Sequence, residues 1–160
     1  MRAAIDNFID NSPEIFKYLI CECHHKDNGK SVYLQKKNEI AFFFLIDNHY
    51  IKNGGKKADI LVYYYNYEPE TITEKDGRLI MIELKGGNIK KAIKQIDATI
   101  KNSSISKFWN RFTGIKIAGI VSSGGSPSQC RSEIEQFKKS HNTVNLKIIR
   151  KQDVCLREFF

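Results

Sequence analysis

Two stretches of this sequence decide its fold: KADILVYYY at residues 57–65 and LIMIELK at residues 79–85. Both are rich in apolar, β-branched and aromatic residues, and turn-forming residues precede each of them, Asn53-Gly54-Gly55 and Asp76-Gly77. The pattern predicts strands over Ala58–Tyr65 and Leu79–Lys85. The segment between them contains Pro69 and is expected to be a connection.

Antiparallel pairing of these strands predicts a specific register. If Asp59 lies opposite Glu83, then Leu61 pairs with Met81 and Tyr63 with Leu79, all on one face of the sheet. Side chains alternate along a strand, so Glu83 and Lys85 share that face, about 6.6 Å apart along the chain. Two carboxylates and an ammonium group are therefore expected to meet at one end of the hairpin.

The rest of the chain predicts further strands and helices around this pair. Asp27-Asn28-Gly29 is a strong turn signal, and its flanks, Ile20–Cys23 and Val32–Leu34, are expected to pair as a hairpin. Ser12-Pro13 predicts a helix start, with an apolar face that includes Leu19 and Ile20. The other expected elements are a strand at Ile40–Ile46, a helix over Ile89–Ile100, a strand at Ile115–Val121, a helix opening at Pro127 and a last strand at Val144–Ile149. Together they predict one α/β domain over residues 1–160, with a mixed β-sheet.

Composition narrows the class of protein. Apolar residues make up 41% and charged residues 28%, which suits a globular core, and the formal net charge is +8. Such a surplus in a small domain suggests a polyanionic partner, although a basic surface alone explains it equally well. The longest apolar run, Ile40–Ile46, is too short to span a membrane, and the N-terminus predicts no signal peptide. Four irregularly spaced cysteines predict no disulfide framework, so a cytoplasmic setting is expected.

The carboxylate pair indicates metal chemistry. Two adjacent carboxylates repel each other unless a positive charge lies between them, and Mg²⁺ or Mn²⁺ binds through one or two carboxylates while keeping several waters. A lysine beside such a metal can stabilise negative charge on a phosphate or orient a water molecule. These groups suit phosphodiester hydrolysis. The alternative interpretation is a solvated strand end with an intrastrand ion pair between Glu83 and Lys85.

These residues resemble the PD-(D/E)XK, or restriction-endonuclease-like, superfamily of nucleases. Lys57-Ala58-Asp59, Glu83-Leu84-Lys85 and Gln95 on the following helix are similar to the family's acidic residue, E-x-K and helical glutamine. The resemblance implies a restriction-endonuclease-like core, in which helices flank a central mixed β-sheet. It implies catalytic roles for Asp59, Glu83, Lys85 and Gln95, with Asp59 and Glu83 as metal ligands.

The sequence departs from the family pattern in two places. Ala58 stands where the name-giving motif has proline, and the gap of 24 residues between Asp59 and Glu83 is long. The family often adds an upstream glutamate to the metal site, for which Glu14 and Glu39 are both candidates. For Gln95, an ordinary polar position at a helix boundary is nearly as good an explanation.

Other signals are weaker. Lys90, Lys91 and Lys94 could bind nucleic-acid phosphates from the outer side of the helix, or form a solvated helix face. Phe108 and Trp109 could stack on a base, although core packing is commoner. Cys21, Cys23, His24 and His25 suggest zinc, but a second ligand pair is missing. The stretch from Gly119 to Pro127 lacks the G-K-[ST] ending of a phosphate loop and is expected to be a polar turn.

The sequence therefore predicts a metal-dependent nuclease that uses Mg²⁺ or Mn²⁺ to hydrolyse phosphodiester bonds. DNA is preferred to RNA as the expected substrate, and the expected enzyme is an endonuclease or resembles a Holliday-junction resolvase. The main alternative is a catalytically inactive nucleic-acid-binding module with the same fold. A protein–protein adaptor is a third hypothesis, which the basic charge disfavours. Whether the chain forms a homodimer is left open, and no membrane partner is expected.

Overall fold

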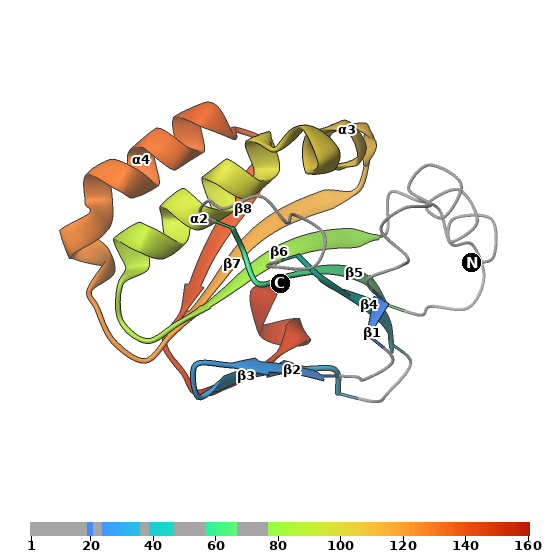
Figure 1. The fold of residues 1–160 in the computed structure, drawn as a ribbon, viewed down its shortest axis with the longest axis horizontal. Coiled ribbons are helices and arrows are strands. Elements are labelled where there is room, and N and C mark those ends of the chain that lie inside the picture. Colours follow the sequence, from blue (N-terminus) through green and yellow to red (C-terminus); the bar gives the residue numbers. More distant parts are fainter. Residues whose placement is uncertain (1–18, 21–23, 36–38, 47–56, 67–76) are drawn as a thin grey trace.

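The computed structural model describes residues 19–20, 24–35, 39–46, 57–66 and 77–160. Two sheets and three α-helices make up this part of the chain (Figure 1). The strands are β1 (Leu19–Ile20), β2 (His24–Asp27), β3 (Lys30–Tyr33), β4 (Glu39–Leu45), β5 (Ile60–Asn66), β6 (Arg78–Lys85), β7 (Ile115–Ser122), β8 (Val144–Ile149) and β9 (Asp153–Cys155). The helices are α2 (Ile89–Lys101), α3 (Ser103–Arg111) and α4 (Arg131–Ser140), with 3-10 turns η3 (Pro127–Cys130) and η4 (Leu156–Phe159).

The larger sheet has six strands in the order β1-β4-β5-β6-β7-β8. The pairs from β1 to β6 are antiparallel, whereas β6, β7 and β8 run parallel, so the sheet is mixed. Helices α2, α3 and α4 lie on one side of it (Figure 1). The predicted α/β class, with a central mixed β-sheet flanked by helices, is confirmed at this level.

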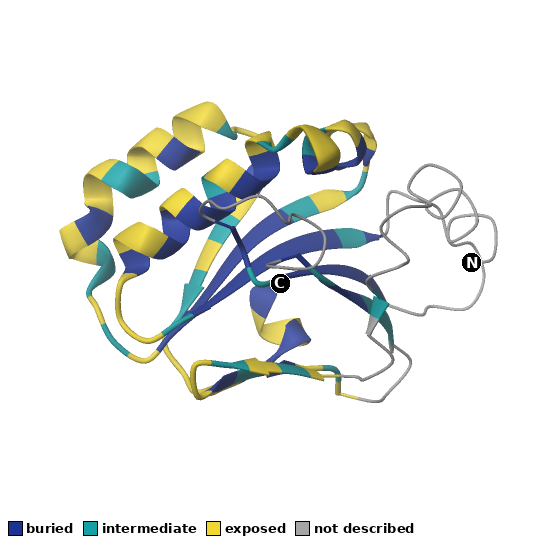
Figure 2. Cartoon of the chain, viewed as in Figure 1, coloured by how far each residue is buried: buried dark blue, intermediate teal, exposed yellow. Residues whose placement is uncertain are grey.

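The other side of the large sheet is covered by a second sheet that the sequence did not predict. Its three strands lie in the order β2-β3-β9, and η4 packs with it against the large sheet (Figure 1). The central strand β6 is therefore buried on both faces, as its unbroken apolar run indicated (Figure 2). Two apolar cores result, one under the helices and one between the sheets.

The prediction was wrong at three points. The turn at Asn28-Gly29 is present, with φ angles of 50° and 70°, but the strands begin directly at the turn, where Asp27 pairs with Lys30, so the expected second strand starts too late. Residues 21–23 of the expected first strand lie outside the described residues. Leu19–Ile20 is a strand paired with β4, not the end of a helix. Val144–Ile149 is not the last strand, because β9 follows it. The expected helix start at Ser12-Pro13 lies outside the described residues.

Local sequence explains where the helices begin. The side chain of Asn88 accepts a hydrogen bond from the Lys91 N–H (2.9 Å) and caps α2, whose apolar residues face the sheet. Asn102 ends α2 and caps α3 by accepting from the Ser104 N–H (3.0 Å), which the sequence analysis missed.

Phe108 and Trp109 of α3 are buried in the core, so core packing explains why these aromatic residues stand there. None of the described helices is both long and apolar enough to cross a membrane.

A close contact between Gly119 and Phe159 joins β7 to η4. A Cβ atom at position 119 would lie 2.5 Å from Phe159 Cε1, and Phe159 is fully buried. We expect Gly119→Ala to lower the free energy of unfolding by about 1–3 kcal/mol through overpacking. Adding Phe159→Leu should make the double variant less destabilised than the sum of the single variants. Urea denaturation measures both, and strictly additive effects would contradict this contact. Gly86→Ala is the control, because a Cβ there meets nothing within 4 Å.

Candidate active site

The pairing of β5 with β6 brings Asp59 beside Glu83. Leu61 pairs with Met81 and Tyr63 with Leu79, in the register that the sequence predicted. Beyond the last paired residues, the Asp59 N–H donates to the Ile82 carbonyl (3.1 Å), and Asp59 Oδ2 accepts from the Leu84 N–H (2.6 Å). The Asp59 carboxylate is thus fastened to the backbone next to Glu83.

Glu83 and Lys85 form an ion pair at the end of β6. Glu83 Oε1 accepts a hydrogen bond from Lys85 Nζ at 2.8 Å. The Glu83 side chain is 0% exposed and that of Lys85 is 18% exposed. By the alternation of β6, both lie on the helix-covered face with Met81. The ion pair exists, but the solvated strand end of the alternative interpretation does not, because Glu83 is buried.

Helix α2 holds the segment that leads into Asp59. Gln95 Nε2 donates to the Lys57 carbonyl (2.7 Å), and the Ala58 N–H donates to Thr99 Oγ1 (2.7 Å). Thr99 Oγ1 in turn donates to the Gln95 carbonyl (2.8 Å). Gln95 therefore lies one short backbone segment away from Asp59. Its Oε1 is buried and has no hydrogen-bond partner among the residues described.

Two residues of this arrangement were missed by the sequence analysis. Thr99 is fully buried, and Lys57 is only 4% exposed although it carries a charge. The spacing offered a signal for Thr99, because it stands one helical turn after Gln95 on the same side of α2. For Lys57, the proximity to Asp59 in the sequence was the only signal.

Two glycine-containing loops meet where β6 and β7 end. Lys85 neighbours Ser122 in the parallel register, and Ser123 Oγ donates to the Gly86 carbonyl (2.5 Å). Gly125 adopts φ 75°, and a Cβ there would collide with the Gly87 carbonyl. From the other side of the sheet, Asn28 Nδ2 at the hairpin tip lies 3.5 Å from the Leu84 carbonyl. The stretch after β7 is thus a polar turn that packs against the loop following Lys85.

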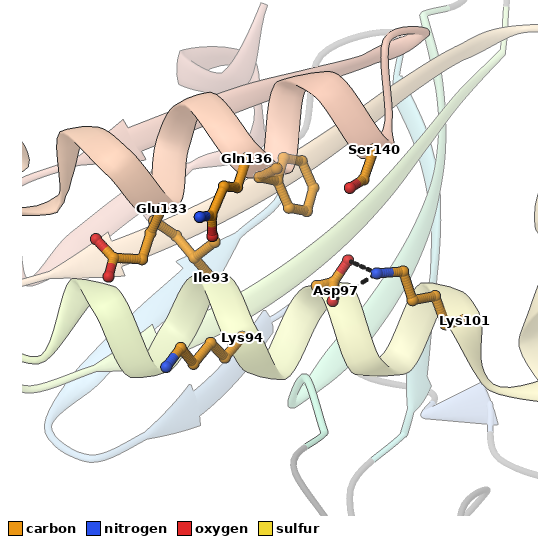
Figure 3. A pocket seen from close by; sticks show the side chains of 8 residues that line it. Ile93, Lys94, Asp97, Lys101, Glu133, Gln136 and Ser140 are labelled. Carbon is orange, nitrogen blue, oxygen red and sulfur yellow. Dashed lines mark hydrogen bonds and ion pairs between the residues drawn. The ribbon is translucent and has the colours of Figure 1, made fainter.

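The three lysines assigned to nucleic acid differ in their surroundings. Lys90 Nζ forms an ion pair with Glu133 Oε1 of α4 at 2.5 Å, and this hydrogen bond raises the pKa of Lys90 and lowers that of Glu133. Lys94 lines a groove between α2 and α4, together with Glu133 and Asp97 (Figure 3). This flank of α2 is therefore of mixed charge.

Lys91 lies on the opposite flank of α2. It precedes Gln95 by four residues, so both project toward the side that faces Lys57. Its side chain is exposed, and within the described segments it makes no ion pair. Of the three lysines, Lys91 is the one whose spacing places it on the Gln95 side of α2.

Candidate metal ligands are few in the described part of the chain. No group of three or more His, Cys, Asp or Glu side chains gathers there. Glu39 pairs with Asn66 at the opposite end of β5 from Asp59, so it does not join this site, and Glu14 lies outside the described residues. Cys21 and Cys23 of the weak zinc pattern also lie outside them. Asp59 and Glu83 remain the carboxylates of the candidate site.

Comparisons with protein-family models, with curated proteins and with solved structures find no match for this chain. The chemistry of the candidate site consists of a buried carboxylate, a second carboxylate on the neighbouring strand and an ammonium group.

The hydroxyl of Thr99 generates a prediction about the support of Asp59. Thr99→Val keeps the shape of the side chain but leaves the buried Ala58 N–H without its acceptor, so we expect a loss of about 1–3 kcal/mol in the free energy of unfolding. Thr143→Val, at an exposed position, is the matched control. Chemical denaturation of the two variants provides the comparison, and equal stabilities would show that Thr99 does not anchor this segment.

Proposed function

We propose that this protein is a metal-dependent nuclease, with Asp59, Glu83 and Lys85 at its active site. The observation that carries the proposal is the burial of Glu83 beside Asp59. Burying one carboxylate next to another is costly, and such arrangements are concentrated at functional sites. The resemblance to PD-(D/E)XK nucleases supports the same residues, because Asp59 directly precedes β5, Glu83 and Lys85 end β6, and Gln95 lies on α2. We extend the resemblance to a restriction-endonuclease-like core.

The donor set fits a hard divalent cation. Asp59 and Glu83 offer carboxylate oxygens, the ligands that Mg²⁺ and Mn²⁺ accept, and waters would complete the coordination. When bound, such a cation supplies Lewis-acid activation of a phosphate and a more acidic water. In its absence Lys85 compensates the charge of Glu83. The ammonium of Lys85 and a cation therefore share one carboxylate, which links metal binding to this ion pair.

The other residues of the site position the metal ligands or stabilise charge on the substrate. Lys85, partly exposed at the strand end, is placed to stabilise negative charge on a scissile phosphate. Gln95 and Thr99 fix the backbone of Lys57 and Ala58, so they act on Asp59 through its support. The net charge of +8 and the exposed Lys91 favour a polyanionic substrate, and we propose DNA.

Lys85 provides the sharpest test. Lys85→Met keeps the aliphatic stem and removes the ammonium group, so cleavage of labelled DNA with Mg²⁺ or Mn²⁺ should slow by about two to four orders of magnitude. Removing one partner of a buried ion pair costs about 3–5 kcal/mol, so the assay is run well below the melting temperature of the variant. Mn²⁺ should raise the melting temperature of Lys85→Met more than that of the wild type, because the cation replaces the lost ammonium beside Glu83.

Two variants control this experiment. Lys107→Met, on the exposed side of α3, should change neither rate nor metal response, and Glu83→Gln should abolish the stabilisation by Mn²⁺. If wild type and Lys85→Met cut equally fast, the mechanism is wrong. If neither cuts DNA or RNA while both bind it, the protein is the inactive binding module instead.

The flanks of α2 predict which lysine contacts the substrate. Lys91→Ala should reduce the slope of log Kd against log salt concentration by about one unit, as expected for the loss of one phosphate contact. The double variant Lys90→Ala/Glu133→Ala removes a neutral ion pair and should leave the slope unchanged. Fluorescence anisotropy with a short DNA duplex measures both. Equal slopes for Lys91→Ala and the wild type would remove Lys91 from the binding surface.

A further inference from the structure

The outer edge of β8 has no strand beside it in the described part of the chain. β8 is the last strand of the large sheet and pairs only with β7 there (Figure 1). An unpaired edge presents backbone N–H and C=O groups that can pair with another extended segment. The surroundings of this edge decide whether it could serve as a binding site.

An open groove of about 350 Å³ runs along this edge. Its lining includes four consecutive strand residues, Val144–Lys147. Because alternate side chains of a strand point to opposite faces, a hollow over one face would be lined by every second residue. Four consecutive residues therefore indicate a groove along the edge itself, where the backbone is accessible.

The N–H groups on the outer edge of β8 can be identified. The Val144 N–H donates to the His141 carbonyl (3.0 Å), so it does not serve the pairing with β7. Successive N–H groups of a strand alternate between its two sides, so those of Leu146 and Ile148 also point away from β7. Both side chains are only partly buried against the helix-side core, so an added strand would cover them further.

The charge of the groove decides which partner suits it. Lys138 and Lys147 contribute ammonium groups, and His141 and Asn142 complete the rim, while no Asp or Glu among the described residues lines it. Within the described residues neither Lys138 nor Lys147 forms an ion pair. Antiparallel pairing of two copies would bring these lysines together, so a second copy of this chain is disfavoured.

We propose that the β8 edge binds an extended, acidic peptide segment, which adds a strand to the large sheet. Backbone hydrogen bonds to Leu146 and Ile148 would provide affinity, and carboxylates on the two faces of the added strand would pair with Lys138 of α4 and with Lys147. The phosphates of a nucleic acid could pair with the two lysines, but a nucleic acid has no extended peptide backbone to pair with the strand edge. The proposal is independent of the nuclease activity, because Val144 aligns with Lys116 at the start of β7, whereas Lys85 aligns with Ser122 at its end.

The test uses a fluorescent peptide of about eight residues that repeats Val-Val-Glu-Glu, so that glutamates occur on both faces of the extended chain, and a matched peptide with lysine in place of glutamate. Wild type should bind the glutamate peptide and not the lysine peptide. Leu146→Pro removes one outward N–H and leaves the pairing with β7 intact, so binding should weaken by about tenfold or more. Leu146→Ala shortens the same side chain but keeps the N–H, and should retain most of the affinity.

Lys138→Glu/Lys147→Glu keeps the test decisive if the proline variant fails to fold, which circular dichroism would reveal. This charge-reversed variant should no longer bind the glutamate peptide and should bind the lysine peptide instead. Equal binding of both peptides to wild type, or unchanged preference in the charge-reversed variant, would overturn the proposal. So would equal weakening by Leu146→Pro and Leu146→Ala in folded proteins. If a DNA duplex protects the Leu146 and Ile148 amides from hydrogen exchange, the edge binds DNA instead. If sedimentation shows self-association and the same amides become protected, the edge binds a second copy of the chain instead.

Discussion

The register between β5 and β6 is the constraint on which the rest of the structure depends. Pairing Leu61 with Met81 and Tyr63 with Leu79 directs these side chains into the helix-side core, and Ile60 and Ile82 into the second core. A slip of one residue would exchange the two sets and turn Glu83 away from α2. Both strands are apolar throughout this stretch, so the charged residues at the strand end distinguish the observed pairing from a shifted one. The register of the strands and the position of the candidate site therefore depend on each other.

At this strand end, the carboxylate that forms the stabilising ion pair is also the proposed ligand of a cation. A carboxylate as buried as Glu83 must be compensated, and Lys85 does this in the described structure. Under the proposed function, a cation bound there would compete with or relieve this pair, so the same residues would affect both folding stability and metal affinity. Hydrogen bonds from α2 to the backbone of Lys57 and Ala58 limit how far Asp59 can adjust. The site is supported by rigid elements on two sides, with glycine-containing loops on the third.

The sequence predicted the two strands, their register and the shared face of Glu83 and Lys85, because the apolar runs mark the strands and the charged residues mark their ends. It also placed α2, whose cap and apolar stripe are local signals. It failed where pairing is between distant segments. The three residues of β9 carry almost no pattern of their own and are a strand because Val154 and Cys155 pair with β3. The ion pair of Lys90 with Glu133 was equally invisible, because it depends on the packing of α4 against α2. The chemical roles of the site residues stay predictions.

The parallel pairing of β3 with β9 has a consequence for folding during synthesis. It joins Ser31–Tyr33 to Asp153–Cys155, segments separated by most of the chain. The helix-side core can form largely before β9 leaves the ribosome, since its buried residues lie between Phe44 and Val144. The second core cannot close until β9 and Phe159 have emerged, and until then the apolar underside of the large sheet is uncovered. A nascent chain of this protein therefore passes through a stage in which one face of its central sheet is open to chaperones and to aggregation.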